Sequence, residues 1–191
     1  NIKPIFRKTN ILNENEIEKF TNAVQYIKNL QQKIVSDLNE MKLDYMTLIG
    51  QWFKEYAPFL KGYDQYLEFY KTNLPKITKA MNSREYASLF ESFSNTAFSN
   101  SLRFDSLLVI PVQHSPRYTL LLKEVLKHTP RNHPDYEDLN NTYDLVDETL
   151  QKLNDEVILL QKKHELINLE SKFSSDVGLI RPDRSFIGSF K

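Results

Sequence analysis

The stretch from Leu107 to Thr129 reads LLVIPVQHSPRYTLLLKEVLKHT. Its apolar side chains would surround a helix on nearly every side, so we expect it at the centre of a helical bundle. Pro111 and Pro116 interrupt this pattern, and each costs about 3 kcal/mol or more in a helix interior. We therefore predict one central helix, from about Leu102 to Lys127, that bends at its prolines.

The composition limits the classes of protein to which the chain can belong. Its 191 residues suffice for one large domain, and its 25 basic and 25 acidic side chains cancel, so we expect no nucleic-acid partner. The chain has no cysteine, which excludes disulfides, thiol catalysis and thiolate metal sites. His128 and His133 lack a third ligand, and no glycine-rich phosphate loop is present. The sequence therefore predicts neither a metal nor a cofactor.

Two other stretches carry helical patterns of apolar residues. The first runs from Ile17 to Met41 at spacings of three and four, and Asn13 with Glu16 forms a capping box at its start. The second runs from Ile49 to Tyr70 and contains Pro58 and a glycine, where we expect a kink or a short break. Its many aromatic side chains are typical of core packing.

The cleanest repeat begins at Tyr136 and continues for about four heptads. Its members are Leu139, Tyr143, Val146, Leu150, Leu153, Val157, Leu160, His164 and Ile167. They predict a helix of roughly 40 residues, on the order of 60 Å long. We assign the acidic residues at its start, Asp135, Glu137 and Asp138, to interaction with the helix dipole. Because such a helix is longer than a compact globule needs, the predicted fold class is all-α, an elongated helical bundle.

A row of polar side chains runs beside this apolar seam at heptad spacing. Asn154 lies about 40–60° from the seam, with Asp147 and Gln161 one heptad on either side and Asn140 and Asn168 further out. An ordinary bundle helix has such a boundary row. A partner-binding surface has one too, because amides offer donors and acceptors and cost less to desolvate than charges. The residues alone leave both interpretations open.

The order P-x-Q-x-x-x-R-Y-x-L-L-L closely resembles the third conserved region of Dbl-homology domains, the exchange factors for Rho-family GTPases. The residues that carry the resemblance are Leu107, Pro111, Gln113, Arg117, Tyr118 and Leu120 to Leu122. The run KHTPRNHPDY, residues 127–136, is similar to the family's link into its last helix. Residues 2–38 are similar to the latter part of its first conserved region. The resemblance implies a Dbl-homology helical domain over residues 1–173.

The resemblance also implies a function. A guanine nucleotide exchange factor accelerates GDP release from a Rho-family small GTPase by remodelling its switch regions, without covalent chemistry, so we expect no catalytic residue and no enzyme in that sense. Dbl-homology domains place a basic residue at Arg117, where it reaches switch II, and an asparagine late in the final helix, here Asn154. Gln113 matches the family's glutamine, and Gln161 completes the expected GTPase-binding surface.

Two departures from the family pattern leave alternatives open. His114 stands where the family usually has arginine. The family's first helix, which carries a glutamate that engages switch I, is expected to begin before Asn1. One alternative is therefore a catalytically weak or autoinhibited GTPase-binding scaffold of the same fold. Another is an elongated bundle that dimerises or lies against a membrane, which would need a basic face; the dispersed charges argue against it.

The end of the chain changes in character. Residues 174–191 contain two glycines and a proline, and they resemble a linker followed by the first strand of a pleckstrin-homology domain, the usual neighbour downstream. We therefore expect that domain in cis, with membrane contact only through it. The resemblance implies a cytoplasmic protein recruited to the membrane periphery, and it does not indicate which Rho-family member is the partner.

Overall fold

The computed structural model describes residues 3–95 and 102–170 of the chain. These residues form helices, with no strand among them, which confirms the predicted all-α class. No helix in this part of the chain is both long and apolar enough to cross a membrane. The predicted domain boundary at residue 173 and the tail 174–191 lie outside the described residues. The elements are α1 (Lys3–Thr9), α2 (Glu14–Glu40), α3 (Ile49–Lys54), the 3-10 helix η1 (Ala57–Gly62), α4 (Tyr63–Met81), α5 (Ala87–Ser94), α6 (Phe104–His114), α7 (Pro116–His128) and α8 (Tyr136–Glu170).

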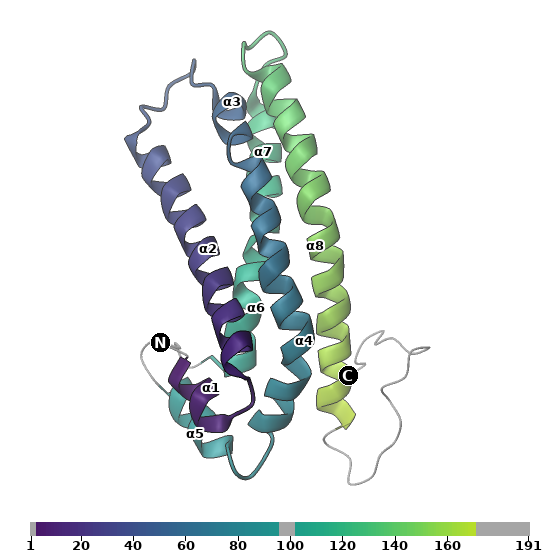
Figure 1. Ribbon diagram of the computed structural model, residues 1–191. Helices are drawn as coiled ribbons and strands as arrows, with labels where there is room; N and C mark the ends of the chain where they lie inside the picture. The colour runs from purple at the N-terminus through teal and green to yellow at the C-terminus, as the bar shows by residue number, and fades with distance from the viewer. Residues whose placement is uncertain (1–2, 96–101, 171–191) are drawn as a thin grey trace.

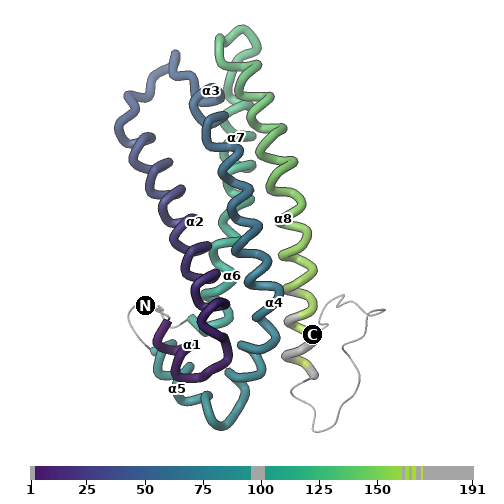
Figure 2. The backbone as a smooth tube through the Cα atoms, in the orientation of Figure 1, coloured from purple at the N-terminus to yellow at the C-terminus, as the bar shows by residue number. Residues whose placement is uncertain are grey.

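The long helices lie side by side in an elongated bundle (Figure 1). In the centre, α4 packs against α2, α6 and α8, and the backbone trace shows α1 and α5 together at one end (Figure 2). Of the predicted central stretch, α6 packs against α4 and α8 and buries Leu108 and Val112. The following helix, α7, packs along α8 with Leu122 as its buried residue and keeps Leu120 and Leu121 exposed. The predicted long last helix is confirmed as α8, with 35 residues.

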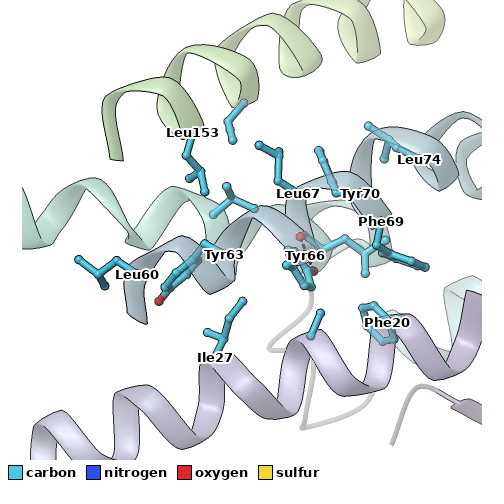
Figure 3. Close-up of a cluster of buried hydrophobic side chains, with 14 of the residues drawn as sticks. Phe20, Ile27, Leu60, Tyr63, Tyr66, Leu67, Phe69, Tyr70, Leu74 and Leu153 are labelled. Atoms are coloured by element: carbon cyan, nitrogen blue, oxygen red, sulfur yellow. Dashed lines mark hydrogen bonds between the residues drawn. The ribbon is translucent and has the colours of Figure 1, made fainter. Parts of the chain in front are cut away.

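Among the described helices, α4 contributes the largest share of the buried core. Figure 3 shows Tyr63, Tyr66 and neighbouring residues of α4 between Phe20 of α2 and Leu153 of α8. The Tyr66 hydroxyl donates a hydrogen bond to the Leu108 carbonyl of α6 at 2.7 Å, so the buried phenol is satisfied. The predicted packing role is therefore confirmed for most aromatic residues of the second pattern, which are buried, whereas Phe59 is exposed.

The starts and breaks of the first two patterns follow their sequence signals. Asn13 and Glu16 form the predicted capping box of α2, each side chain accepting from the other's backbone N–H at 2.9 Å. The second pattern breaks into α3, η1 and α4, with Pro58 near the start of η1. Gly62 ends η1, and a Cβ at this position would overlap the ring of Tyr26. A glycine there therefore lets α2 approach the start of α4.

The predicted central helix is divided at Ser115 into α6 and α7. Pro116, the first residue of α7, has no N–H to donate to the Val112 carbonyl. Ser115 replaces that donor with its own N–H, at 3.3 Å, and with its hydroxyl, at 2.8 Å. Ser115 keeps helical backbone angles, φ −61° and ψ −41°, so α6 and α7 continue as one interrupted rod. The break is confirmed at Pro116, whereas Pro111 lies inside α6.

The beginning of α8 holds α3 in place. Asp135, just before α8, accepts hydrogen bonds from the N–H groups of Gly50, at 2.7 Å, and Gln51, at 3.1 Å. The Thr142 hydroxyl donates to the Gly50 carbonyl at 3.0 Å. A Cβ on Gly50 would overlap the backbone of Leu139, so the close approach requires glycine. The assignment of Asp135 to its own helix dipole is therefore corrected, because its carboxylate caps α3.

We expect Asp135→Ala to lower the free energy of unfolding by about 2–3 kcal/mol, because two backbone N–H groups at the start of α3 lose a buried, charged acceptor. Asp135→Asn retains one acceptor oxygen and should fall between the wild type and the alanine variant. Urea unfolding followed by far-ultraviolet circular dichroism measures both losses.

The matched control is Asp138→Ala, one turn further along α8. It removes the exposed ion pair of Asp138 with Lys54, at 3.2 Å, and such pairs contribute about 0–1 kcal/mol. Equal losses from the Asp135 and Asp138 alanine variants would contradict the capping role.

Candidate functional site

One face of α7 carries a cation and two leucines in contact with solvent. Arg117 lies in the first turn of α7, and Leu120 and Leu121 follow three and four positions later, so the three side chains share a face. Leu120 is 65% exposed and Leu121 is 64% exposed. Arg117 is exposed as well, and no ion pair is recorded for it in the described part of the chain. On this face, the Arg117 guanidinium has no recorded ion pair with a described residue and lies beside the exposed side chains of Leu120 and Leu121.

Tyr118 fixes the opposite, buried side of α7. Its ring packs against Phe53 of α3, with ring centroids 5.6 Å apart. Its hydroxyl lies close to the Tyr63 hydroxyl of α4, which accepts a hydrogen bond from Gln31 Nε2 of α2 at 3.0 Å. Burial raises the pKa of the Tyr118 phenol, so it stays neutral. These contacts hold Tyr118 against α3 and α4, while Arg117 is exposed.

Gln113 and His114 end α6 just before Arg117. Both side chains are exposed. Over the described ranges, the Gln113 amide has no hydrogen-bond partner and His114 has no ion pair. The position at which the resembled family usually has arginine is therefore open to solvent, and His114 makes no salt bridge of its own there.

On α8, the polar row lies at the edge of the buried seam. Asn154 is half-buried, and no hydrogen bond of its amide is recorded with another described residue. Asp147 and Asn140 are half-buried in the same row, and Asn140 Nδ2 donates to Asp144 at 3.3 Å. The side chains of Gln161 and Asn168 lie outside the described ones, so the place of Gln161 in this row remains a prediction. The buried seam itself consists of Leu139, Val146, Leu150, Leu153 and Val157.

The polar row lies on the side of the seam away from α3 and α4. Glu156 of α8 forms an ion pair with Lys71 of α4, and at 100° per residue Glu156 is about 160° around the helix from Asn154. Thr142, which contacts α3, is about 120° from Asn154. Since α6 and α7 also pack along α8, the row borders these two helices.

The positions of the candidate residues along the bundle axis, which we call their heights, follow from the antiparallel pairing of α7 and α8. Residues 129–135 connect these two helices (Figure 1). Arg117 lies eleven residues before the end of α7 and Asp147 eleven residues after the start of α8, at a similar height. Asn154 is one heptad further, about 10 Å along the helix, and nearer to the height of Gln113. The three predicted residues Gln113, Arg117 and Asn154 therefore lie at neighbouring positions along adjacent helices, and we call the part of the surface that carries them, together with Leu120 and Leu121, the α6–α8 surface.

The chemistry of the α6–α8 surface suits binding of a macromolecule. Within residues 3–95 and 102–170, no group of histidine, aspartate and glutamate side chains is arranged to hold a metal ion. Its components are an unpaired arginine, unpaired amides and exposed leucines. Arginine is among the residues that contribute most of the energy in protein–protein interfaces, and leucines beside it add apolar area that a partner can bury.

The sequence did not predict that Leu120 and Leu121 belong to this surface. They belong to a run of three leucines that looks like core, and only Leu122 is buried. The sequence did contain a signal for their exposure. They follow Arg117 by three and four positions, so they share a helix face with a cation that is expected to be exposed.

A family model described as the RhoGEF domain matches residues 1–154 of the chain. Rac guanine nucleotide exchange factor JJ of Dictyostelium discoideum is 28% identical over 181 residues, covering 95% of this chain and 15% of that protein. Rac guanine nucleotide exchange factor B of the same organism is 30% identical over 145 residues, 73% of this chain and 12% of that protein. The mouse FYVE, RhoGEF and PH domain-containing protein 3 is 25% identical over 140 residues, 73% of this chain and 19% of its own length.

The fold is similar to that of a solved structure, the crystal structure of the DH domain of FARP2. The TM-score is 0.66 with 14% sequence identity, over 90% of this chain and 85% of that one. This likeness concerns the arrangement of helices. The chain spans less than a fifth of the length of each of the three curated relatives.

We expect Tyr118→Phe to lower the free energy of unfolding by about 1–2 kcal/mol, because the buried Tyr63 hydroxyl loses the neighbouring polar group on Tyr118. Tyr26→Phe is the control, since it removes an exposed hydrogen bond to the Phe59 carbonyl, 3.0 Å long. Thermal and urea unfolding measure both variants. A Tyr118→Phe domain as stable as the wild type would show that the contact between the two hydroxyls does not help to position α7.

Proposed function

The chain belongs to the RhoGEF domain family, and from that premise we propose that it binds a Rho-family small GTPase and accelerates release of its GDP. The observation that carries the proposal is the extent of the family match. It runs to residue 154 and so includes all of α7 and Asn154. Two curated relatives named as Rac guanine nucleotide exchange factors support the same activity.

The proposed mechanism is conformational, so the protein forms and breaks no covalent bond. Arg117 offers a planar set of donors for carbonyl and carboxylate groups of the GTPase switch II region. The Asn154 amide can donate and accept, and Gln113 and Gln161 extend the contact along the α6–α8 surface. Contacts that hold the switches away from their nucleotide-bound arrangement disfavour Mg²⁺ and open the nucleotide site.

Thermodynamic linkage defines what this surface must achieve. A protein that binds the nucleotide-free GTPase more tightly than the GDP-loaded form weakens GDP binding by the same factor. Equal affinity for the two forms would shift nothing, however tight the complex. Excess GTP then occupies the open site and releases the exchange factor.

A Rac-type GTPase is the first partner to test, because two relatives carry Rac in their names. A pleckstrin-homology domain in cis is part of the same proposal. The relative FYVE, RhoGEF and PH domain-containing protein 3 carries that domain in its name, and the tail after residue 173 resembles its first strand. Such a neighbour would recruit the protein to the membrane periphery.

The second candidate function is a GTPase-binding scaffold with weak or autoinhibited exchange. The observation that favours it is the exposed His114 at a position where the family usually has arginine. Binding to a GTPase without acceleration of GDP release would identify this function and reject the first.

We expect Arg117→Ala and Asn154→Ala each to slow GDP release at least tenfold, a loss of about 1.4 kcal/mol or more of differential binding. Release of fluorescent GDP from a Rac-type GTPase, with and without the domain, measures the effect. Both side chains lack intramolecular partners among the described residues, so the variants should unfold at the wild-type temperature.

The matched controls are Arg84→Ala and Asn141→Ala. Arg84 is exposed between α4 and α5, and Asn141 is exposed on α8 about 140° around the helix from Asn154. These variants should keep wild-type exchange. If the Arg117 and Asn154 variants are folded and accelerate GDP release at the wild-type rate, the α6–α8 surface is not the GTPase-binding site.

Leu120→Ser combined with Leu121→Ser should weaken binding to the nucleotide-free GTPase at least tenfold, because the complex loses apolar area that it buries. Stability should change little, since both leucines are exposed. Leu159→Ser, an exposed position on the far side of α8, is the control. Calorimetric titration compares the affinities, and an unchanged affinity in the double variant would exclude the leucines from the interface.

A further inference from the structure

The connection between α2 and α3 contains a tight turn whose polar groups bond to one another. The Thr47 N–H donates to the Asp44 carbonyl at 3.2 Å, which closes a turn with Tyr45 and Met46 at its two central positions. Asp44 Oδ1 accepts from the Met46 N–H at 2.9 Å and from the Thr47 hydroxyl at 3.0 Å. These bonds give the turn a defined shape.

The turn presents large apolar side chains to solvent. Leu43 is 61% exposed, Tyr45 69% and Met46 59%, and Leu48 is exposed beside them. Single exposed apolar residues are ordinary on protein surfaces, but a contiguous group marks an interaction site. Neither the core nor the α6–α8 surface uses these four side chains.

A basic pocket opens at the end of α7 and in the segment that leads to α8. Its volume is about 460 Å³, and its charged lining residues are Lys123, Lys127 and Arg131. Lys127 is paired with Glu124 at 3.2 Å. No ion pair is recorded for Lys123 or Arg131 with any residue that the structure describes. Two cations of the pocket are therefore available to an anionic ligand.

The turn contacts the segment between α7 and α8, which also supplies Thr129, Pro130 and Arg131 to the pocket. His133 Nδ1 accepts from the Asp135 N–H at 3.1 Å, so Nε2 carries the proton and donates to the Tyr45 carbonyl at 2.6 Å. The Tyr45 and His133 rings meet edge to face, 5.2 Å apart. Figures 1 and 2 show both connections at the end of the bundle opposite the described end of α8. We call this surface the tip and define it as residues 43–48 with Lys123, Lys127 and Arg131.

We propose that the tip binds a membrane surface that contains anionic phospholipids. Leu43, Tyr45 and Met46 enter the headgroup region, and Lys123 and Arg131 contact lipid phosphates. Apolar side chains beside basic ones form the combination that partitions into this region of a bilayer. Each basic residue near an anionic leaflet strengthens binding about fivefold. A soluble phosphate could use the pocket but would leave the apolar turn without a role, and so the two features together favour a lipid surface.

Several acidic side chains at this end of the bundle are occupied, whereas Glu55 and Glu137 are exposed and have no recorded ion pair among the described residues. The Asp44 carboxylate is held within its own turn, and Asp135 caps α3. Glu124 is paired with Lys127 and with His128 at 3.0 Å, and Asp138 is paired with Lys54. The unpaired cations of the pocket are therefore not cancelled by a carboxylate in direct contact.

The proposal gives this chain a membrane contact of its own, whereas the sequence predicts contact only through a neighbouring domain. It does not depend on exchange activity, because lipid binding is measured without a GTPase. The tip is also separate from the α6–α8 surface, so neither set of variants removes a residue of the other.

Co-sedimentation with vesicles tests the proposal. The chain should bind vesicles of phosphatidylcholine with phosphatidylserine and should not bind phosphatidylcholine alone, and added salt should weaken binding. Lys123→Ala with Arg131→Ala should lower the partition coefficient about 25-fold, from about fivefold per cation. Leu43→Ser with Met46→Ser should lower it at least tenfold. Tyr45 is left intact because its ring packs against His133.

Each matched control removes the same kind and number of side chains as one of the double variants, but from positions outside the tip. Lys79→Ala with Arg84→Ala removes two exposed cations at the other end of α4, and Leu145→Ser with Leu159→Ser removes two exposed leucines of α8. Both controls should bind vesicles as the wild type does, and all variants should show the wild-type unfolding temperature.

Three outcomes would overturn the proposal. The first is equal or absent binding to the two vesicle types. The second is a loss in the Lys79 and Arg84 control as large as that in the pocket variant, which would mean unspecific charge attraction. The third is wild-type binding by the Leu43 and Met46 variant, which would leave an anion pocket without insertion into the bilayer.

Discussion

The close contact between Gly50 and the start of α8 determines where the rest of the final helix lies. Asp135 holds the N–H side of Gly50, Thr142 holds its carbonyl, and the absent side chain lets the two backbones touch. Because α8 is one continuous helix, a fixed start fixes the height and rotation of every later residue. Asn154 comes about 28 Å beyond Asp135 at 1.5 Å per residue, and its place beside α6 and α7 depends on this anchor.

A second constraint orients the other half of the α6–α8 surface. Pro116 would leave the Val112 carbonyl without a donor, and Ser115 supplies two. The rod therefore continues past the proline, while Tyr118 turns inward to Tyr63 and Phe53. The same rotation exposes Arg117, Leu120 and Leu121. The buried side chains and those proposed to bind a partner thus lie on different faces of one helix, so the exposed face could serve recognition without weakening the core.

Local signals in the sequence were enough to predict most helices. The heptad seam from Leu139 to Val157 predicted α8, Asn13 and Glu16 predicted the start of α2, and Pro116 predicted a break. The burial of individual leucines was harder to predict, because an apolar residue in a sequence pattern does not reveal whether another helix covers it. Leu122 of α7 is buried, whereas its neighbours Leu120 and Leu121 are exposed.

Contacts between distant segments could not be read from the chain. Asp135 resembles an ordinary acidic residue at a helix start, and only the folded chain shows that it caps α3. The resemblance to Dbl-homology domains singled out Gln113, Arg117 and Asn154, but their common surface depends on the pairing of α7 with α8. The exposed turn at the tip carries no motif, and its meaning depends on the basic pocket that His133 places beside it.

The central claim is that this domain prefers a GTPase that has lost its nucleotide. The most direct measurement is a comparison of its affinity for a Rac-type GTPase in the nucleotide-free and the Mg²⁺–GDP-loaded states, by calorimetry under identical conditions. The account predicts tighter binding of the nucleotide-free form, by on the order of 100-fold. Equal affinities would contradict it, because a protein that binds both states alike cannot drive GDP release.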